Sequence, residues 1–286
     1  MRKYTRMSVD EDVEEFCGWE FLTRLTNECD NTLYRFLPDK FRKRDKALVA
    51  TAFLTGGRIS EVLMLRRSNF EFQEERIVVK DMALLKRYEK IREYLDVRDE
   101  KPEGAFSDLY HYSYKREAWV KRTFDTKPIV KIRKDFPIPY FEPLTPIMVE
   151  WVKDANDWLF PTNYLGGKFY CDGVESFAKE FLGVKSRKWI TKTLGYSIVR
   201  EVGQRALEGS ELRKKMSRKD FHIWPHWFRS QRASQLGQEY RFKDPHINRF
   251  FGWETFRKTQ ARRYAKTSME ELWELMKPEK VRCERK

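Results

Sequence analysis

Apolar residues recur at helical spacing in the first part of the chain. Residues 1–40 carry scattered apolar positions, which indicate one or two short helices. An apolar helical face then runs through KFRKRDKALVATAFLTGG, and Gly56-Gly57 stops it. The following segment, RISEVLMLRRSNF, has apolar residues three and four apart, which predicts a second helix directly after the glycines.

Period-two alternation follows this helical block. The segment FEFQEERIVVKDM alternates and then turns β-branched, which predicts a β-hairpin. A third strand is predicted at KPIVKIRKDFPIPY, where Pro137 and Pro139 mark its end or an edge position. Residues 87–127 are mixed in charge, rich in tyrosine and weakly periodic, and are interpreted as an elongated hairpin tip or an inserted loop.

The rest of the chain is predicted to be helical. Pro146 opens one helix, at a position where proline is favoured. Further helices are expected near residues 168–183, 188–208, 226–240 and 243–252. The C-terminal SMEELWELMKPEK is amphipathic and begins with a capping box of Ser268 and Glu271. The predicted fold class is therefore α+β, mostly helical, with a small three-stranded antiparallel sheet.

Composition changes this picture chiefly through charge. The chain has 286 residues, enough for one large domain or two modest ones. Its 58 lysines and arginines exceed its 44 aspartates and glutamates, so the formal net charge is +14. A field of this sign attracts polyanions and above all nucleic acid, although a solubility device or a ribosome-associated protein would have the same balance.

Composition also disfavours several other classes of protein. The 4 cysteines are far apart and form no CxxC pair, so neither a zinc site nor a disulfide framework is expected. The N-terminal MRKYTRMSVDEDVEEF lacks the apolar core of a signal peptide. No apolar run approaches the roughly 18 residues that span a bilayer. A soluble cytoplasmic protein that does not associate with membranes is expected.

Two segments contain candidate phosphate-binding groups. Arg58 follows the glycine pair at the start of a helix, where a guanidinium can present its planar donors to a phosphate. Most arginines at such positions are only surface residues. His226 and Arg229, in HWFRSQRASQL, share a helix face, which is an unusual pair for packing and makes sense if both face an anion.

Two further segments supply reactive groups. In FFGWETFRKTQARRYAK, Trp253 follows a glycine and Tyr264 lies in a basic stretch. A phenol can attack a phosphodiester, although packing is the plainer interpretation of both aromatic residues. In VVKDMALLKR, Lys80 or Lys86 can protonate a leaving oxygen if neighbouring arginines lower its pKa, although most lysines in so basic a chain are merely solvated.

Taken in order, these segments resemble the motifs of the tyrosine recombinase, or phage integrase, superfamily. The family's first box, approximately TGxRxxE, is similar to TGGRISE here, and its HxLRH box is similar to HWFRS. The VPL strand box with the later LFP resembles PIPYFEPLTPIMVEWVKDANDWLFPT, and the final LGW followed by a tyrosine resembles FFGWETFRKTQARRY. The resemblance implies a catalytic domain over residues 41–267, after a short helical segment (1–40) and before a C-terminal helix and tail (268–286).

The resemblance implies phosphate-binding roles for four residues. Arg58 and Arg229 would bind the non-bridging oxygens of the scissile phosphate. His226 would assist proton transfer or phosphate positioning, and Trp253 would donate its indole N–H to the phosphate. No metal and no cofactor are expected, because the arginines supply the positive charge.

The resemblance also implies a nucleophile and an acid. Tyr264 would attack the phosphate and form a 3′-phosphotyrosyl bond. Lys86 would be the general acid for the 5′-oxygen, with Lys80 as the alternative. Glu61 would brace the first box.

Double-stranded DNA is the partner that the resemblance implies, bound by a homo-tetramer whose C-terminal segment either docks on a neighbouring protomer or packs on its own core. Only 57 residues precede Arg58, fewer than the family's N-terminal clamp requires, so the chain is expected to be either a catalytic-domain fragment or a protein that grips DNA with its short N-terminal helices and the insertion at 87–127. It holds Lys115, Arg116, Lys121 and Arg122 among aromatic residues. Such a mixture suits contacts with the DNA backbone and equally a solvated loop.

The predicted function is site-specific DNA recombination, for the integration or excision of a mobile element, in the cytoplasm at the nucleoid. A type IB topoisomerase-like enzyme would use the same phosphotyrosine chemistry, and supercoil relaxation without strand exchange would favour it. A catalytically inactive DNA-binding protein would keep only the fold.

Overall fold

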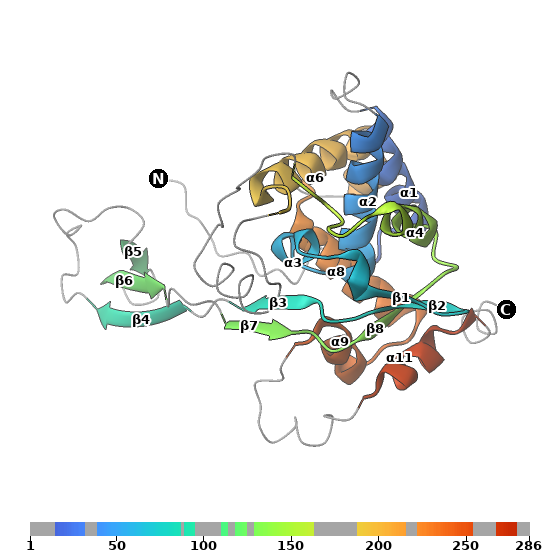
Figure 1. The fold of residues 1–286 in the computed structure, drawn as a ribbon. Coiled ribbons are helices and arrows are strands. Elements are labelled where there is room, and N and C mark those ends of the chain that lie inside the picture. Colours follow the sequence, from blue (N-terminus) through green and yellow to red (C-terminus); the bar gives the residue numbers. More distant parts are fainter. Residues whose placement is uncertain are drawn as a thin grey trace. The chain divides into compact units, whose positions relative to one another are not determined.

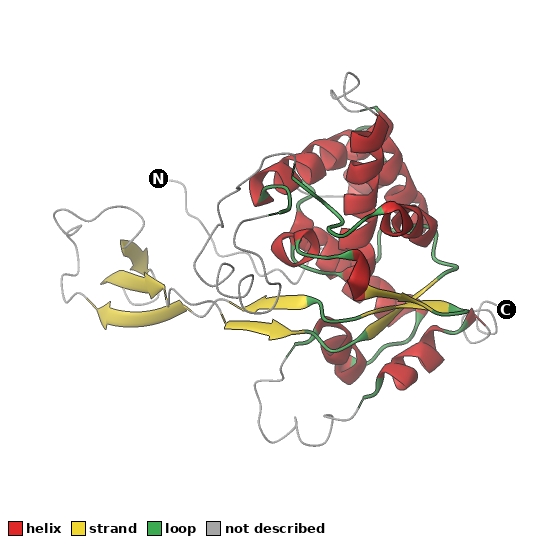
Figure 2. Cartoon of the chain, viewed as in Figure 1, coloured by secondary structure: helices red, strands yellow, loops and turns green. Residues whose placement is uncertain are grey.

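The computed structural model describes residues 15–31, 39–86, 89–94, 110–113, 118–124, 129–162, 188–215, 222–253 and 267–278. The chain divides into two compact units. Unit 1 comprises Met1–Leu84, Ile132–Leu165 and Lys188–Lys286, and unit 2 comprises Leu85–Lys131 and Gly166–Arg187. Figures 1 and 2 show the described helices and strands.

Helices make up most of unit 1. They are α1 (Trp19–Asn27), α2 (Asp39–Thr55), α3 (Ile59–Leu63), α4 (Thr145–Asp154), α6 (Lys192–Leu207), α7 (Glu211–Lys215), α8 (Pro225–Glu239), α9 (Asp244–Phe251) and α11 (Met269–Met276), with the 3-10 turns η1 (Glu28–Asp30) and η3 (Arg67–Asn69). The helices predicted around 188–208, 226–240 and 243–252 are confirmed as α6, α8 and α9. The helix predicted near 168–183 lies outside the described residues.

α2 is the central helix of unit 1. Every residue from Ala47 to Leu54 is fully buried. A helix that is enclosed on all sides needs neighbours around its whole circumference, and α1, α3, α4, α6 and α8 all pack against it (Figure 1). The predicted stop at the glycine pair is confirmed, because α2 ends at Thr55 and α3 begins at Ile59.

An antiparallel sheet in the order β1-β2-β8 completes unit 1. β1 (Phe70–Phe72) and β2 (Arg76–Val79) form the predicted hairpin, and β8 (Phe136–Pro139) pairs with β2. β8 is an outer strand, where prolines are tolerated because an edge position need not donate an N–H. The predicted edge position of Pro137 and Pro139 is thereby confirmed, as is the predicted α+β fold class with its three-stranded sheet. The single strand predicted over KPIVKIRKDFPIPY is wrong, because the segment forms two strands, β7 (Ile129–Ile132) and β8, which belong to different sheets.

The amphipathic C-terminal helix α11 packs against β8 of its own chain. In Figure 1, α9 and α11 lie below this sheet, whereas α2, α3 and α4 lie above it. Leu272, Trp273 and Met276 are buried, as the helical spacing predicts. Half of the predicted capping box is confirmed, because the backbone N–H of Glu271 donates to Ser268 Oγ at 3.0 Å, whereas the Glu271 carboxylate lies 3.3 Å from His246 Nε2.

Unit 2 contains a sheet of its own. β4 (Glu89–Tyr94), β6 (Ala118–Phe124) and β5 (Tyr110–Ser113) are antiparallel in the order β4-β6-β5. The chain forms a further two-stranded sheet from β3 (Ala83–Lys86) and β7 (Ile129–Ile132). The insertion is therefore neither a simple hairpin tip nor a loop, because β5 adds a third strand to the β4–β6 pair.

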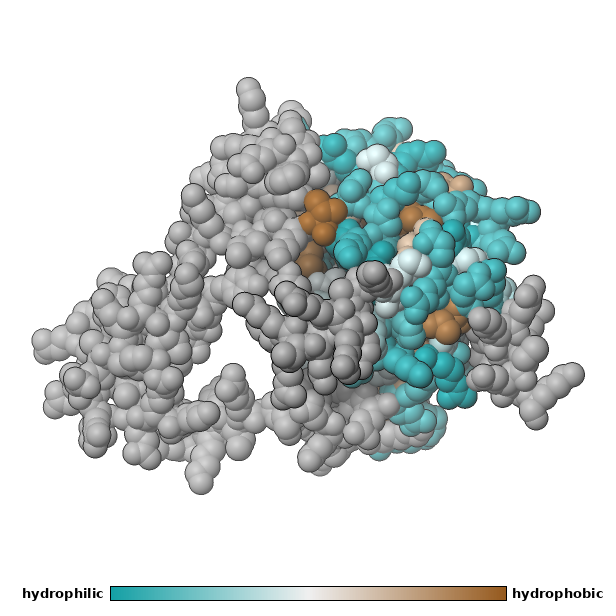
Figure 3. Space-filling view, turned by 90° about the horizontal axis from the view of Figure 1, so that it is seen from below, coloured by the Kyte–Doolittle hydropathy of each residue, from teal (hydrophilic) through white to brown (hydrophobic). Residues whose placement is uncertain are grey.

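The coloured part of the face in Figure 3 is mostly hydrophilic, with isolated hydrophobic spots. Large exposed apolar side chains in the described residues are Ile132, Phe141, Tyr196, Trp224 and Trp253. Within the same residues, no helix is both long enough and apolar enough to cross a bilayer.

A buried ion pair fixes α8 against the turn after β8. Arg232 Nη1 lies 2.7 Å from Glu142 Oε1, and these side chains are 0% and 1% exposed. Tyr240 donates its hydroxyl to the same carboxylate oxygen at 2.7 Å. Burial, and then the charge of Glu142, raise the pKa of Tyr240, so the phenol stays protonated and can donate. The pair anchors the helix that also carries Arg229.

A Glu142→Gln substitution tests this anchor. It leaves Arg232 as a buried cation without its counter-charge, so we expect a loss of about 3–5 kcal/mol in the free energy of unfolding, measured by urea denaturation. The exposed pair of Lys43 and Glu150, 3.3 Å apart, provides the control. Glu150→Gln should cost less than about 1 kcal/mol, and equal losses in both variants would contradict the assigned importance of the buried pair.

Candidate functional site

The turn between α2 and α3 depends on its two glycines. Gly56 has φ +56°, a left-handed conformation that ends α2 and that side chains other than glycine rarely adopt. A Cβ atom at Gly56 would lie 2.2 Å from Phe251 Cε1, and one at Gly57 would lie 2.3 Å from Met82 Cε. The glycines therefore let the turn approach Phe251 in α9 and Met82 after β2 closely. The turn places Arg58 at the N-terminus of α3.

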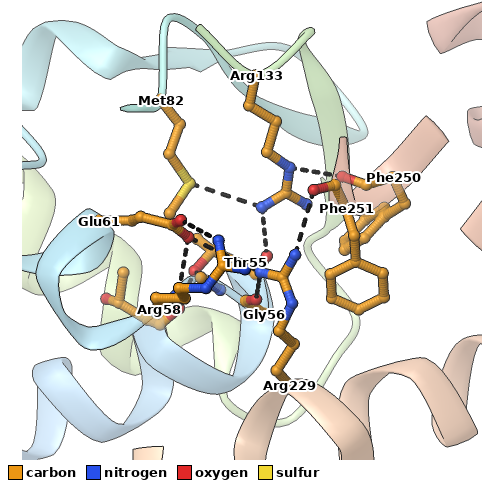
Figure 4. A network of polar contacts seen from close by, with 11 residues as sticks. Thr55, Gly56, Arg58, Glu61, Met82, Arg133, Arg229, Phe250 and Phe251 are labelled. Carbon is orange, nitrogen blue, oxygen red and sulfur yellow. Dashed lines mark hydrogen bonds and ion pairs between the residues drawn. The ribbon is translucent and has the colours of Figure 1, made fainter. Parts of the chain in front are cut away.

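Glu61 joins the two predicted arginines (Figure 4). Its side chain is 1% exposed, and its Oε1 atom accepts a hydrogen bond from Arg58 Nη1 at 2.9 Å. Its Oε2 atom accepts from the backbone N–H of Arg58 at 2.7 Å and lies 3.7 Å from Arg229 Nη1. One buried carboxylate thus holds guanidinium groups from α3 and α8, which supports the bracing role expected for Glu61.

Arg229 lies beneath this cluster. Its side chain is 2% exposed, with Nη1 donating to Gly56 O at 2.7 Å and Nη2 donating to Phe251 O at 3.3 Å. Its guanidinium lies 4.8 Å from the Phe251 ring centroid and 5.1 Å from that of Trp253. Burial, and then the neighbouring Arg58, lower the pKa of Arg229 to about 10, so it remains a cation at neutral pH.

His226 and Trp253 bound the exposed side of the cluster. His226 lies one helical turn before Arg229 and is exposed near the start of α8. Partial burial, and then the charges of Arg229 and Arg58, lower the pKa of the imidazole. Trp253 is 39% exposed and stacks on Phe251 at 4.8 Å with an interplanar angle of 17°. Its position is fixed because its backbone N–H donates to Asn248 O at 2.8 Å across the end of α9.

Arg133 joins the network although the sequence does not single it out. It precedes β8, is 2% exposed, and donates from Nη1 to Thr55 O at 2.7 Å and from Nε to Phe250 O at 2.5 Å (Figure 4). In the sequence it is one of several basic residues in KIRK. The one hint in the sequence is that Arg133 lies in a segment predicted to form a strand, and this hint is weak.

The charge balance of this cluster favours an anion. The guanidinium groups of Arg58, Arg133 and Arg229 face Glu61, the acidic residue that contacts Arg58 and Arg229 among the described residues. The contacts of the described residues thus set three guanidinium groups against one carboxylate in a largely buried place. Positive charges are costly to bury without negative partners. Arg58 and His226 lie exposed beside the buried guanidinium groups. The arrangement is chemically suited to a phosphate, whose oxygens accept such donors.

The expected pKa of Lys80 is wrong in direction. Lys80 forms an exposed ion pair with Glu71 across the β1–β2 hairpin. The hydrogen bond to Glu71, and then its negative charge, raise the pKa of Lys80 rather than lower it. Glu71 favours the protonated amine, so Lys80 is a weaker acid here than the predicted role requires.

The structure brings together four of the predicted site residues: Arg58, Arg229, His226 and Trp253. Tyr264, Lys115 and Arg116 lie outside the described residues, as do the side chains of Lys86 in β3 and of Lys121 and Arg122 in β6. Thr267, three residues after Tyr264, accepts a hydrogen bond from Arg249 Nε at 3.0 Å. Arg249 belongs to α9, the helix whose C-terminal end is followed by Trp253.

Comparisons with known proteins give limited information. No protein-family model matches the sequence, and no curated protein matches it. Among solved structures, the chain is similar to XerH site-specific recombinase bound to difH substrate in a pre-cleavage complex, with a TM-score of 0.41 and 16% identity over 90% of this chain and 51% of that chain. A post-cleavage complex of XerH with palindromic difH gives a TM-score of 0.44 and 15% identity over 92% of this chain and 53% of that chain. The chain spans about half the length of these XerH chains, and similarity of this extent assigns neither a family nor a function.

A Gly56→Ala substitution tests the geometry of the turn. Gly209 provides the control, since its φ of +67° is equally unfavourable for alanine, whereas no atom lies within 4 Å of an added Cβ. We expect Gly209→Ala to cost about 1 kcal/mol of unfolding free energy from its conformation alone. Gly56→Ala should cost about 1–3 kcal/mol more of unfolding free energy, because Phe251 must move. Sulfate, used in place of a phosphate group, should stabilise the wild-type protein and should not stabilise Gly56→Ala. Chemical denaturation with and without sulfate measures both, and equal behaviour of the two variants would contradict the close approach.

The pH dependence of His226 tests the electrostatics. Because its pKa is lowered in the folded protein, the unfolded chain binds the proton first as the pH falls. The contribution of His226 to stability is therefore present above the ordinary value of 6.5 and decreases below it. We expect an NMR titration midpoint below 6.5 that rises when sulfate is added, because an anion favours the imidazolium. The His226→Gln variant assigns the resonance, and a midpoint at or above 6.5 without sulfate would refute the influence of the arginines.

Proposed function

We propose that this chain is a site-specific DNA recombinase of the tyrosine recombinase type, which cleaves and rejoins DNA through a 3′-phosphotyrosyl intermediate. The observation that carries the proposal is the convergence of Arg58, His226 and Trp253 around Arg229, with Glu61 holding the two arginines. They come from three separated segments, in the order in which the family's motifs occur. A cluster of guanidinium groups with an exposed side suits a phosphodiester.

Phosphate binding is divided among three residues. Arg58 has a side chain that is 46% exposed and would donate to the non-bridging oxygens. Trp253 donates its indole N–H from the opposite side. Arg229 contributes its charge from beneath Trp253, where water is excluded and the charge acts more strongly. These cations stabilise the charge that develops on the phosphate during attack.

The covalent step is a transfer of the phosphoryl group to tyrosine. The hydroxyl oxygen of Tyr264 attacks phosphorus, the bond from phosphorus to the 5′-oxygen breaks, and the DNA 3′-phosphate becomes esterified to the phenol. His226, neutral at neutral pH because its pKa is lowered, is suited to accept the phenol proton. The leaving 5′-oxygen takes a proton from Lys86, whereas Lys80 is no longer favoured for this role because its pKa is raised. Attack by a 5′-hydroxyl of another strand reverses these steps and releases the enzyme.

The proposed partner is double-stranded DNA, bound by a homo-tetramer. The basic residues of the insertion, Lys115, Arg116, Lys121 and Arg122, would contact the DNA backbone from unit 2. The C-terminal helix packs on β8 of its own chain, so an exchange between protomers would require α11 to leave this position.

A trapping experiment tests the nucleophile. The protein is incubated in EDTA with a library of nicked duplexes of random sequence, from which the cleaved end can diffuse away, and covalent adducts are isolated under denaturing conditions and sequenced. We expect adducts with the wild-type chain and none with Tyr264→Phe. Tyr196→Phe, which changes an exposed tyrosine on α6, is the control and should form adducts normally.

Each other outcome has a distinct meaning. Adducts with Tyr264→Phe would move the nucleophile to another residue. Tight DNA binding without any adduct would contradict strand cleavage and favour a catalytically inactive DNA-binding protein. Adducts accompanied by relaxation of supercoiled plasmid, without exchange between duplexes that share the recovered sequence, would favour a topoisomerase-like enzyme.

A further inference from the structure

Arg133 ties three parts of unit 1 together. Its backbone N–H donates to Met82 O at 2.8 Å, and its Nη1 atom lies 3.6 Å from Met82 Sδ, so the residue is fixed to the β2–β3 connection. Its guanidinium then donates to Thr55 O at the end of α2 and to Phe250 O near the end of α9. One residue therefore connects the β2–β3 connection with two helix ends that are distant in the sequence.

Arg133 and Arg229 bind neighbouring carbonyl groups at the same two helix ends. Arg133 donates to Thr55 O and Phe250 O, whereas Arg229 donates to Gly56 O and Phe251 O. The last carbonyl groups of a helix have no partner within it and carry partial negative charge. The C-terminal ends of α2 and α9 would repel each other, and two guanidinium groups between them remove this repulsion (Figure 4).

These helix ends lead directly to exposed residues of the candidate site. Thr55 precedes Arg58 by three residues, and Phe250 precedes Trp253 by three residues. The distance between the two helix ends therefore sets the distance between Arg58 and Trp253. Arg229 also donates to the two helix ends, but it belongs to α8 and lies against Trp253. Arg133 reaches the helix ends from the segment before β8 instead.

Arg133 itself has no access to a ligand. It is 2% exposed, and its guanidinium lies 3.5 Å from the Phe136 ring centroid and 4.9 Å from that of Phe250. Burial, and then the charge of Arg229, lower the pKa of Arg133. Burying a guanidinium beside another cation is unfavourable, and the hydrogen bonds of Arg133 to the two helix ends offset part of this cost.

We propose that Arg133 is a positioning residue of the phosphate site, which holds the ends of α2 and α9 together so that Arg58 and Trp253 face one phosphate group. The proposal rests on the proposed function, since it assigns Arg133 a part in the cleavage step without contact with DNA. It predicts that loss of the two-sided guanidinium contact impairs cleavage more than it impairs DNA binding, which the remaining basic surface supports.

The test compares Arg133→Lys with Arg232→Lys. Both arginines are almost fully buried, both lie near the Phe250 ring, and both substitutions keep the charge, but Arg232 is paired with Glu142 and not with the helix ends. Lysine cannot donate to Thr55 O and Phe250 O with the planar geometry of a guanidinium. We measure the adduct formation rate at saturating nicked duplex, the Kd for the same DNA, and the unfolding free energy.

We expect Arg133→Lys to slow adduct formation on the order of 10²-fold, as for a displacement of about 1 Å in an active site, with little change in Kd. Arg232→Lys should form adducts at the wild-type rate even where it loses as much stability. Equal adduct rates in the two variants, or rates that follow stability alone, would overturn the positioning role.

A second measurement tests the positioning role of Arg133 without requiring DNA cleavage. The rise of the His226 titration midpoint on adding sulfate reports anion binding at the site and needs no cleavage. If the wild-type chain forms no adduct, the proposed function fails, but loss of the sulfate response in Arg133→Lys and its retention in Arg232→Lys would still support Arg133 as a positioning residue. Retention of the response in both variants would overturn it.

Discussion

The fold of unit 1 depends on a meeting of two helix ends that would otherwise repel each other. The C-terminal carbonyl groups of α2 and α9 are buried close together, out of reach of water. Arg133 and Arg229 satisfy them by donating to Thr55, Gly56, Phe250 and Phe251. The left-handed Gly56 permits this approach because it has no Cβ to collide with Phe251. The conformation of Gly56, its packing against Phe251 and the charges of the two arginines therefore all act where the two helix ends meet. The exposed site residues follow directly from these helix ends.

Glu61 limits the cost of concentrating so many cations. It is buried, and it neutralises part of the charge of Arg58 and Arg229 while fixing the start of α3 through the Arg58 backbone. Among the contacts of the described residues, it is one carboxylate set against two guanidinium groups. A second acidic residue would make the empty protein more stable and would weaken its attraction for an anion. The local balance is thus one that favours binding over stability.

Local features of the fold could be predicted from the sequence, because they follow from nearby residues. The glycine stop after α2, the β1–β2 hairpin, the proline-bearing edge strand and the capped C-terminal helix are of this kind. The neighbourhood of Arg58 and Arg229 was accessible only through the resemblance to a family, since tertiary packing joins α3 to α8.

Other features could not be predicted, because they arise from contacts between distant segments. Arg133 is distinguished from the lysines around it only by burial, which depends on α2 and α9 meeting above it. The third strand of unit 2, β5, comes from a stretch without clear periodicity. The direction of the Lys80 pKa could not be predicted for a different reason, because it depends on Glu71, which lies opposite on the hairpin, rather than on the arginines.

The two prolines of β8 also bear on how copies of this chain can associate. A sheet edge with free N–H and C=O groups is a template on which another chain can add a strand, and this is a common route to aggregation. Pro137 and Pro139 remove donors from the outer edge of the β1-β2-β8 sheet, and α11 packs against the same strand. The sheet therefore cannot be extended regularly beyond β8, and association on this side must rely on side chains and helices rather than on backbone pairing.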